Sequence, residues 1–416
     1  MGHPLLELAD RLWEGAEGIE GHHPVGFTGD LIDFGDGLAF LPSFANVTAF
    51  DTSEGLVLID TGGFVISSMV HERIRGWSKS PLHTAIYSHG HVDHVFGVPH
   101  FEAEDGPPPR VVAHEGVNAR FDRYALTAGY NGVINARQFQ LPELDFPTDF
   151  RRPDETFRDR LDLEVGGERF ELHHARGETD DHVWTWVPGR RVLCCGDLFI
   201  WATPNAGNPQ KAQRHPRDWA LALREMEQLG AELMLPGHGL PLVGAERVRA
   251  ALSDTASLLE SLCEQTLELM NRGATLDEVI HTVSAPQELI DRPYLRPVYD
   301  EPEFIVRNLW RLYGGWHDGD PSHLKPAPAA ALAAELAELA GGAGRLAERA
   351  RELATAGELR LAGHLAELAL QAAPASASAR SARSEVNRMR AEAEASTMSR
   401  GIFSWAAIEI PQEREP

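Results

Sequence analysis

The chain has 416 residues, 43% of them apolar, and carries a formal net charge of −24. At about 150 residues per domain, this length predicts two or three domains with sizeable cores. The negative charge argues against nucleic acid and anionic membranes as partners, because both bind a basic face.

Two further features indicate a cytoplasmic protein without a membrane span. Residues 1–7 lack the basic and apolar regions of a signal peptide, and no apolar run approaches the ~18 residues that a transmembrane helix needs. Cys194, Cys195 and Cys263 show no metal-binding spacing. We therefore expect thiols that pack in the core of a protein from a reducing compartment.

The first part of the chain predicts a layered α/β domain, because strands alternate with helices. We expect strands at 46–50, 56–59, 84–87 and 111–114 and a helix at 66–78. Asp60 directly follows the second of these strands. A carboxylate at a strand end can orient metal-binding imidazoles.

Residues 115–160 predict a long irregular segment that is rich in aromatic, Arg and Asn residues. Such a segment inside a compact domain is often a binding loop. Asn131 and Arg137 in this segment are therefore candidate substrate contacts.

Strands and then helices follow in the second part of the chain. Trp219, Leu223 and Met226 form an apolar stripe at helical spacing, which indicates core packing. Thr275 and Glu278 predict a capping box at the start of a helix, and 325–328 reads as a linker. The remaining predicted elements are strands at 169–174, 183–187, 192–195 and 232–235, and helices at 245–272, 303–313, 329–340, 343–356, 358–373 and 376–396.

The strongest chemical signal is the run 88–94, which follows the predicted strand 84–87. It places three imidazoles and a carboxylate in the order His-x-His-x-Asp-His. These side chains are ligands that Zn²⁺ and similar divalent ions prefer. In a loop that leaves a strand, His89 and His91 can face one metal while Asp93 and His94 face a second.

More candidate ligands stand at the ends of later predicted strands. Glu178 lies in a turn after the strand 169–174, Asp197 follows the strand 192–195, and His238 follows the strand 232–235. One sheet edge would gather all three, so their placement agrees with a metal site.

This order of motifs resembles the metallo-β-lactamase superfamily. The resemblance implies an αββα sandwich with a dinuclear site at one sheet edge. The usual third ligand segment reads His-Thr-Pro-Gly-His, whereas residues 174–178 of this chain end in Glu178, as in the zinc alkylsulfatase branch. Residues 311–321 are similar to the run that opens the alkylsulfatase dimerisation domain. The implied organisation is a metallo-β-lactamase-like catalytic domain at 1–270 and an all-helical, dimerisation-type domain at 271–416.

The resemblance also implies two metal ions per chain and a homodimer. Zinc is the expected metal, with iron or manganese as alternatives. The implied ligands are His89, His91 and Glu178 for one ion and Asp93, His94 and His238 for the other, with Asp197 between them.

The implied function is hydrolysis of a small anionic sulfate ester by a hydroxide that two metals share. Asp93 and Asp197 would be catalytic as ligands of the reacting centre, and His215 is a candidate general acid. With the two residues of the irregular segment, the predicted substrate contacts are Asn131, Arg137, Asn205, Lys211 and Arg214.

Other functions stay open at this point. Another ester, a lactone or a thioester could be the substrate, and four His with three carboxylates also suit a di-iron redox protein. A binding or scaffold protein is a third reading. Residues 197–201 depart from the Glu-Asn run of known alkylsulfatases, and the chain reaches Pro416 without the sterol-carrier-like domain that those enzymes often carry. Long-chain alkyl sulfates are therefore not assigned as the substrate.

Overall fold

The computed structural model describes residues 3–26, 29–141 and 144–408. The chain divides into two compact units, the first formed by 1–128 with 146–316 and the second by 129–145 with 317–416. In the described ranges, no helix is long and apolar enough to cross a bilayer.

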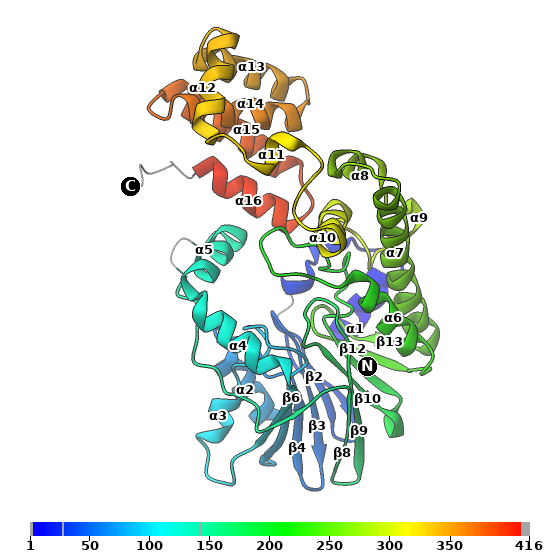
Figure 1. Cartoon of the computed structure of the whole chain (residues 1–416). Coiled ribbons are helices and arrows are strands. Elements are labelled where there is room, and N and C mark those ends of the chain that lie inside the picture. Colours follow the sequence, from blue (N-terminus) through cyan, green and yellow to red (C-terminus); the bar gives the residue numbers. More distant parts are fainter. Residues whose placement is uncertain (1–2, 27–28, 142–143, 409–416) are drawn as a thin grey trace. The chain divides into compact units, whose positions relative to one another are not determined.

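The first unit contains two β-sheets that lie face to face (Figure 1). The first sheet has the strand order β1-β2-β3-β4-β5-β6-β7. Neighbours from β1 to β4 are antiparallel, whereas β4 to β7 run parallel. Its strands are β1 (Ile32–Gly35), β2 (Leu38–Leu41), β3 (Val47–Thr52), β4 (Gly55–Ile59), β5 (Leu82–Ile86), β6 (Arg110–His114) and β7 (Glu155–Phe157).

The second sheet has the order β13-β12-β11-β10-β9-β8. Its neighbours are antiparallel except β11 and β12, which run parallel. Its strands are β8 (Arg160–Val165), β9 (Glu168–His174), β10 (Val183–Val187), β11 (Val192–Gly196), β12 (Leu233–Pro236) and β13 (Leu242–Val243).

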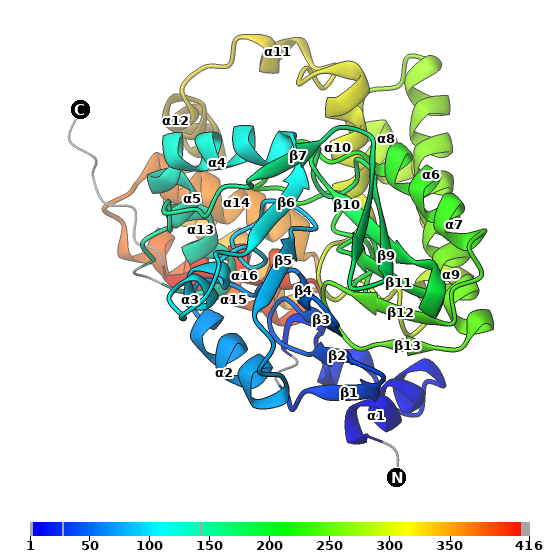
Figure 2. The same ribbon diagram turned by 90° about the horizontal axis from the view of Figure 1, so that it is seen from below.

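Helices cover the outer faces of both sheets (Figure 2). Phe50 and Phe170 meet edge to face in the core between the sheets, with ring centroids 5.1 Å apart. The helices of this unit are α1 (Pro4–Trp13), α2 (Ser67–Trp77), α3 (Val98–Glu102), α4 (Gly116–Leu126), α6 (Pro216–Glu227), α7 (Ala245–Asn271), α8 (Leu276–Thr282), α9 (Gln287–Ile290) and α10 (Pro302–Gly314), with 3₁₀ turns at Ile19–Gly21, Pro24–Gly26 and Pro188–Arg190. This arrangement is the predicted αββα sandwich.

Most predicted elements are confirmed within a few residues. The stripe of Trp219, Leu223 and Met226 is buried on α6, and both hydrogen bonds of the capping box between Thr275 and Glu278 are present. The described cysteines are free and buried, as expected.

The irregular segment predicted at 115–160 is wrong in its first part. Residues there form α4 and α5 (Ala128–Phe139). Val117, Phe121 and Tyr124 are buried on α4. Their spacing of four and three residues gives that helix an apolar face, which outweighs the low helix propensity of its Gly and Asn residues.

The predicted domain boundary after residue 270 falls inside the first compact unit. Val279 of α8 and Ile305 and Leu309 of α10 belong to the same buried cluster as Leu252 and Leu259 of α7. The chain from 271 to 316 therefore packs on the second sheet's helical layer and completes the first unit.

The second unit is helical in its described part, as predicted for the C-terminal region. Its helices bury mainly alanine, for example Ala347, Ala369 and Ala382 in one cluster and Ala350 and Ala366 in another. Besides most of α5, they are α11 (Pro321–Leu324), α12 (Ala329–Ala340), α13 (Ala343–Thr355), α14 (Leu359–Ala372), α15 (Ala377–Ala393) and α16 (Thr397–Ile408), of which α16 was not predicted.

Candidate metal centre

The ends of several strands of the first unit gather the predicted ligands. β4 and β5 are parallel neighbours, so Asp60 and the loop that carries His89 leave the first sheet at the same edge. In the second sheet, β11 and β12 are also parallel, and Asp197 and His238 follow them directly. Glu178 lies in the turn between β9 and β10.

The first group of ligand-type side chains contains His89, His91, Glu178 and Asp197. Nε2 of His89 and Nδ1 of His91 are 2.8 Å apart and therefore point at one place. Glu178 approaches them with Oε1 at 3.8 Å from His91 Nδ1 and Oε2 at 3.9 Å from His89 Nε2.

The second group contains Asp93, His94 and His238, and Asp197 joins it to the first. Asp93 Oδ2 lies 3.4 Å from His94 Nε2 and 3.5 Å from His238 Nε2. Asp197 places Oδ1 at 3.5 Å from His94 Nε2 and Oδ2 at 3.2 Å from His238 Nε2 and 3.7 Å from His89 Nε2. One carboxylate thus reaches both groups.

The donor set fits divalent cations. In each group the nitrogen and carboxylate-oxygen atoms lie within 4.8 Å of one another. Among the described residues, His94 Nε2 and Asp197 Oδ1 are buried without a hydrogen-bond partner. A buried polar atom normally has a hydrogen-bond partner. Buried ligand-type atoms without one are therefore expected where a cation would bind.

The pKa values of the residues in the site shift in opposite directions. Burial lowers the pKa values of His89 and His91 well below the usual range, so both imidazoles are neutral, the form that binds a metal. Burial raises the pKa of Glu178 well above the usual range. Burial has the same tendency for Asp197, but His238 and His94 outweigh it and hold the pKa of that carboxyl well below its usual range.

Asp60 contacts His94 of the second group at the ring nitrogen that does not face the other ligands. Its Oδ2 lies 2.8 Å from His94 Nδ1 and accepts a hydrogen bond from Ser88 Oγ at 2.7 Å, and its Oδ1 accepts one from the Ser88 N–H at 2.7 Å. Asp60 has a φ of 59°, a left-handed conformation that Asp tolerates better than most residues. The expected role of Asp60 in orienting an imidazole agrees with these contacts.

A buried ion pair that sequence reasoning missed supports the histidine loop. Asp181 accepts two hydrogen bonds from Arg120 Nε, at 2.8 and 2.9 Å, and one from the Gly90 N–H at 3.1 Å. A Cβ on Gly90 would come within 2.9 Å of Arg120 Cδ and 3.0 Å of Asp181 Oδ2. Glycine is therefore needed between His89 and His91 for this close approach.

The loop that carries His238 is held from the first sheet, by Asn46 and Phe44. Asn46 donates from Nδ2 to the carbonyl oxygens of Pro236 (2.9 Å) and Gly239 (3.0 Å), and the Phe44 carbonyl contacts His238 Nδ1. Sequence reasoning treated Asn46 only as the start of a strand. Its partners are about 190 residues away, so no local signal identifies them.

Asn205 and Arg214, predicted as substrate contacts, lie against Glu178. Asn205 Nδ2 and Arg214 donate to Glu178 Oε1, the latter from NH2 at 3.2 Å, and a second nitrogen of Arg214 donates to the Glu178 carbonyl. Arg214 is only 2% exposed. These contacts place both residues behind a candidate ligand, and a direct contact with substrate stays a prediction.

The remaining predicted residues are less closely tied to the cluster. Lys211 is half-buried, and burial together with Arg214 lowers its pKa to about 8. His215 precedes α6 and donates from its backbone N–H to Gly177, and burial and Arg176 lower its pKa. Asn131 and Arg137 lie on α5 in the second unit. Their roles stay predictions.

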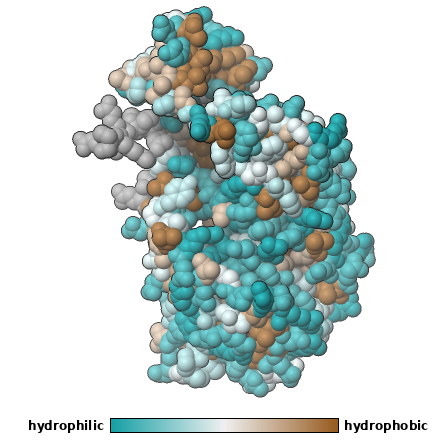
Figure 3. All heavy atoms as spheres, viewed as in Figure 1, coloured by the Kyte–Doolittle hydropathy of each residue, from teal (hydrophilic) through white to brown (hydrophobic). Residues whose placement is uncertain are grey.

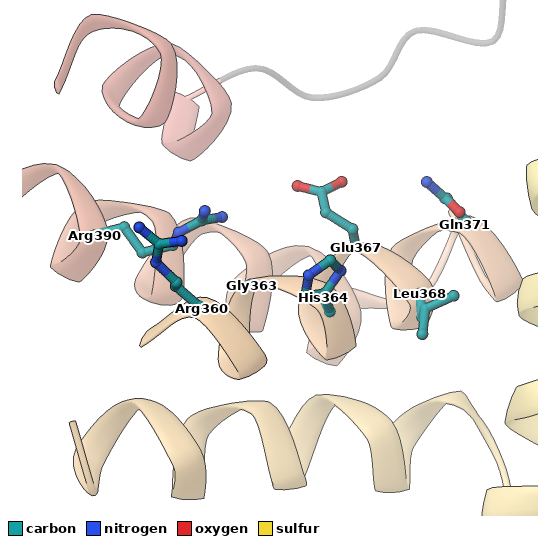
Figure 4. Close-up of a pocket in the computed structure, with 7 residues that line it drawn as sticks. All are labelled: Arg360, Gly363, His364, Glu367, Leu368, Gln371 and Arg390. Carbon is teal, nitrogen blue, oxygen red and sulfur yellow. The ribbon is translucent and has the colours of Figure 1, made fainter. Parts of the chain in front are cut away.

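The second unit contains a shallow pocket of its own. It has a volume of about 350 Å³ and lies along α14, with Arg390 contributed by α15 (Figure 4). Arg390 lies over the Phe403 ring, 3.8 Å from its centroid, and a Cβ on Gly363 would collide with this guanidinium. The pocket is lined by Arg360, Gly363, His364, Glu367, Leu368, Gln371 and Arg390, and none of these is a predicted site residue.

Two regions of the chain match known protein families. Residues 41–238 match the family model of the metallo-beta-lactamase superfamily, and residues 275–413 match that of alkyl sulfatase dimerisation. Residues 41–238 are therefore similar to the metallo-beta-lactamase superfamily. The combination of the two matched regions agrees with the predicted resemblance to the alkylsulfatase-like branch.

Curated relatives agree with these matches. The chain is 30% identical over 346 residues to a linear primary-alkylsulfatase from Pseudomonas sp., covering 77% of this chain and 65% of that protein. It is 24% identical to an (R)-specific secondary-alkylsulfatase from Pseudomonas sp. (88% and 60% covered) and 24% identical to an alkyl/aryl-sulfatase from Saccharomyces cerevisiae (88% and 61%). The chain thus spans 60% to 65% of the length of these relatives.

A solved structure shows the same fold. The stereoselective inverting sec-alkylsulfatase Pisa1 from Pseudomonas sp. superposes with a TM-score of 0.82 at 22% identity, covering 92% of this chain and 66% of that chain. At this identity the likeness concerns the fold.

Proposed function

We propose that this chain is a dinuclear metallohydrolase that cleaves a sulfate ester. The observation that carries the proposal is the convergence of the two ligand groups on Asp197, in a chain that is similar to alkylsulfatases. The proposed ions are zinc, one held by His89, His91 and Glu178 and the other by Asp93, His94 and His238, with Asp197 shared.

Two divalent ions held there would supply Lewis acidity and a water ligand of lowered pKa at neutral pH. The chain's own residues would fix the geometry. Asp60 holds His94, and the Arg120–Asp181 pair holds the backbone of Gly90. Asn205 and Arg214 hold Glu178, which favours a positioning role for both. Lys211 would attract the anionic ester, and His215 stays the proposed general acid.

The proposal is tested by metal analysis of the purified protein combined with a panel of sulfate, phosphate, lactone and thioester substrates. We expect about two zinc ions per chain, turnover of a sulfate ester, and loss of turnover in His91→Ala. A metal-free preparation with full activity would contradict the proposal. A visible iron absorption band with oxygen uptake would instead support the di-iron redox function.

The charge on Lys211 predicts a pH dependence of substrate binding. Because the pKa of Lys211 is lowered to about 8, its ammonium group is charged below that pH and loses its proton above it. We expect KM for a sulfate ester to rise about tenfold between pH 7 and 9.5, the scale of one charged hydrogen bond, ~1.5 kcal/mol. Steady-state kinetics across this range measure the effect.

Lys211→Arg provides the matched control, because a guanidinium stays charged throughout this pH range. The KM of Lys211→Arg should not change with pH. Lys211→Ala should have, at every pH, the raised KM that the wild type shows at pH 9.5. The same rise of KM in Lys211→Arg as in the wild type would assign the titration to another group.

We further propose a homodimer that forms through α12. This helix buries Ala333 and Ala337 and exposes Leu332, Leu336 and Leu339, whose spacing of four and three residues forms one apolar stripe. Figure 3 shows apolar side chains gathered on the surface of this helical region. An apolar stripe on a surface helix is typical of an interaction site, and this region matches the alkyl sulfatase dimerisation family.

Replacing Leu336 and Leu339 by glutamate is expected to halve the mass measured by sedimentation velocity, because two charges would have to be buried in the interface. Leu221→Glu, at an exposed leucine of α6, is the matched control and should leave the mass unchanged. A wild-type chain that sediments as a monomer would refute the dimer. A cytoplasmic location remains part of the proposal, supported by the buried free thiols.

A further inference from the structure

The loop between β11 and α6 contacts Glu178 of the metal cluster on one side and the start of α10 on the other. We call residues 203–214 of this loop the support loop. At its metal side, Asn205 and Arg214 hold the side chain and the carbonyl of Glu178. Sequence reasoning did not single out any residue that holds the loop on its other side.

Asp300, two residues before the start of α10, holds the middle of the support loop by hydrogen bonds. Its Oδ2 accepts hydrogen bonds from the N–H groups of Gly207 at 2.6 Å and Asn208 at 3.1 Å, and its Oδ1 accepts one from Glu301 at 2.8 Å. Asp300 is fully buried. A Cβ on Gly207 would collide with the backbone of Phe304, so the loop lies directly on the first turn of α10.

Asn308 on α10 holds the end of the support loop by hydrogen bonds. Its Oδ1 accepts from Gln213 Nε2 at 2.7 Å and from the Arg214 N–H at 3.3 Å, and its Nδ2 donates to the Arg214 carbonyl at 3.1 Å. The amide therefore fixes the backbone of the residue whose guanidinium holds Glu178. Both Asn308 and Arg214 are buried, so water cannot readily replace these bonds.

We infer that Asp300 and Asn308 are positioning residues for the first ligand group: they fix the support loop, and the support loop fixes Glu178. The inference rests on the proposed function, because it takes Glu178 to be a metal ligand. Hydrogen-bond partners of metal ligands typically contribute 10- to 100-fold to metal affinity. Asp300 and Asn308 lie one step further from the metal, in a segment more than 100 positions beyond Glu178 in sequence, so we expect an effect at the lower end of this range.

The test is a Zn²⁺ titration of the metal-free full-length protein against a competing chelator, with bound zinc counted by elemental analysis. Asn308→Ala is expected to weaken one of the two zinc affinities about tenfold, the lower end of that range, and leave the other unchanged. Asn308→Asp keeps the acceptor for Gln213 and Arg214 and should restore part of the loss. Asp300→Asn should weaken the same single ion, and it provides the test should Asn308→Ala fail to fold.

Arg307→Ala is the matched control on α10. Its side chain is exposed and pairs with Glu303 on the same helix, so both zinc affinities should equal those of the wild type. Unchanged affinities in Asn308→Ala and Asp300→Asn, or equal weakening of both ions, would overturn the inference while leaving the proposed function intact. A wild-type protein that binds no zinc or other divalent ion would overturn the proposed function and the inference together.

Discussion

Replacing Asp197 by alanine is expected to lower kcat/KM about 1000-fold or more, and to reduce bound zinc from two ions to one or none. Asp197 is the side chain that reaches both ligand groups, with its oxygens 3.2 Å from His238 Nε2 and 3.7 Å from His89 Nε2. A catalytic metal contributes several kcal/mol to the transition state, and each ~1.4 kcal/mol corresponds to a factor of ten. Steady-state kinetics and elemental analysis measure the two effects.

Asp197→Asn separates the charge of this residue from its shape. It keeps one oxygen as a possible ligand and loses the negative charge, so we expect metal content between that of wild type and that of Asp197→Ala. Activity within tenfold of wild type in Asp197→Ala would show that the two groups do not act as one centre.

Asp181→Ala is expected to destabilise the first unit by about 3–5 kcal/mol, the usual cost of leaving one partner of a buried ion pair uncompensated. Asp181 is fully buried and Arg120 is 5% exposed. The substitution also removes the acceptor for the Gly90 N–H in the histidine loop. Equilibrium urea unfolding, followed by tryptophan fluorescence, measures the change in the free energy of unfolding.

The neighbouring Asp180 offers a control on the same arginine. Asp180 also pairs with Arg120, but its side chain is 63% exposed. Asp180→Ala should therefore cost no more than ~1 kcal/mol, as for other solvent-exposed pairs. A stability of Asp181→Ala within 1 kcal/mol of wild type would mean that water reaches and solvates Arg120.

The clustering of the candidate ligands could be predicted from sequence because each of them stands near the end of a recognisable strand. An apolar run precedes His89, Asp197 and His238 in each case. Each run predicts a strand, so it also predicts that these residues lie at strand ends. Parallel strands end at the same edge, so residues that follow the parallel pair β4 and β5, or the parallel pair β11 and β12, are expected to lie close together within their own sheet.

What sequence could not provide are the distant residues that hold the backbone segments around these candidate ligands. Asn46, Asp300 and Asn308 act through hydrogen bonds to residues about 90 to 190 positions away, and a side-chain amide or carboxylate carries no local sign of such a partner. The error at α4 had a different origin. Its apolar spacing was present, but the surrounding polar and aromatic residues were given more weight than the periodicity.

The packing of α10 on the support loop has a consequence for how such chains can evolve. The family match named for dimerisation begins at residue 275, yet residues 275–316 fold within the first unit. A recombination event that exchanged the whole matched region would replace Asp300 and Asn308 along with the helices of the second unit. A crossover after Trp316 would leave the contacts of Asp300 and Asn308 to the support loop intact. Residues 275–316 are therefore expected to be inherited with the rest of the first unit, and natural exchange of the helical region should occur after Trp316.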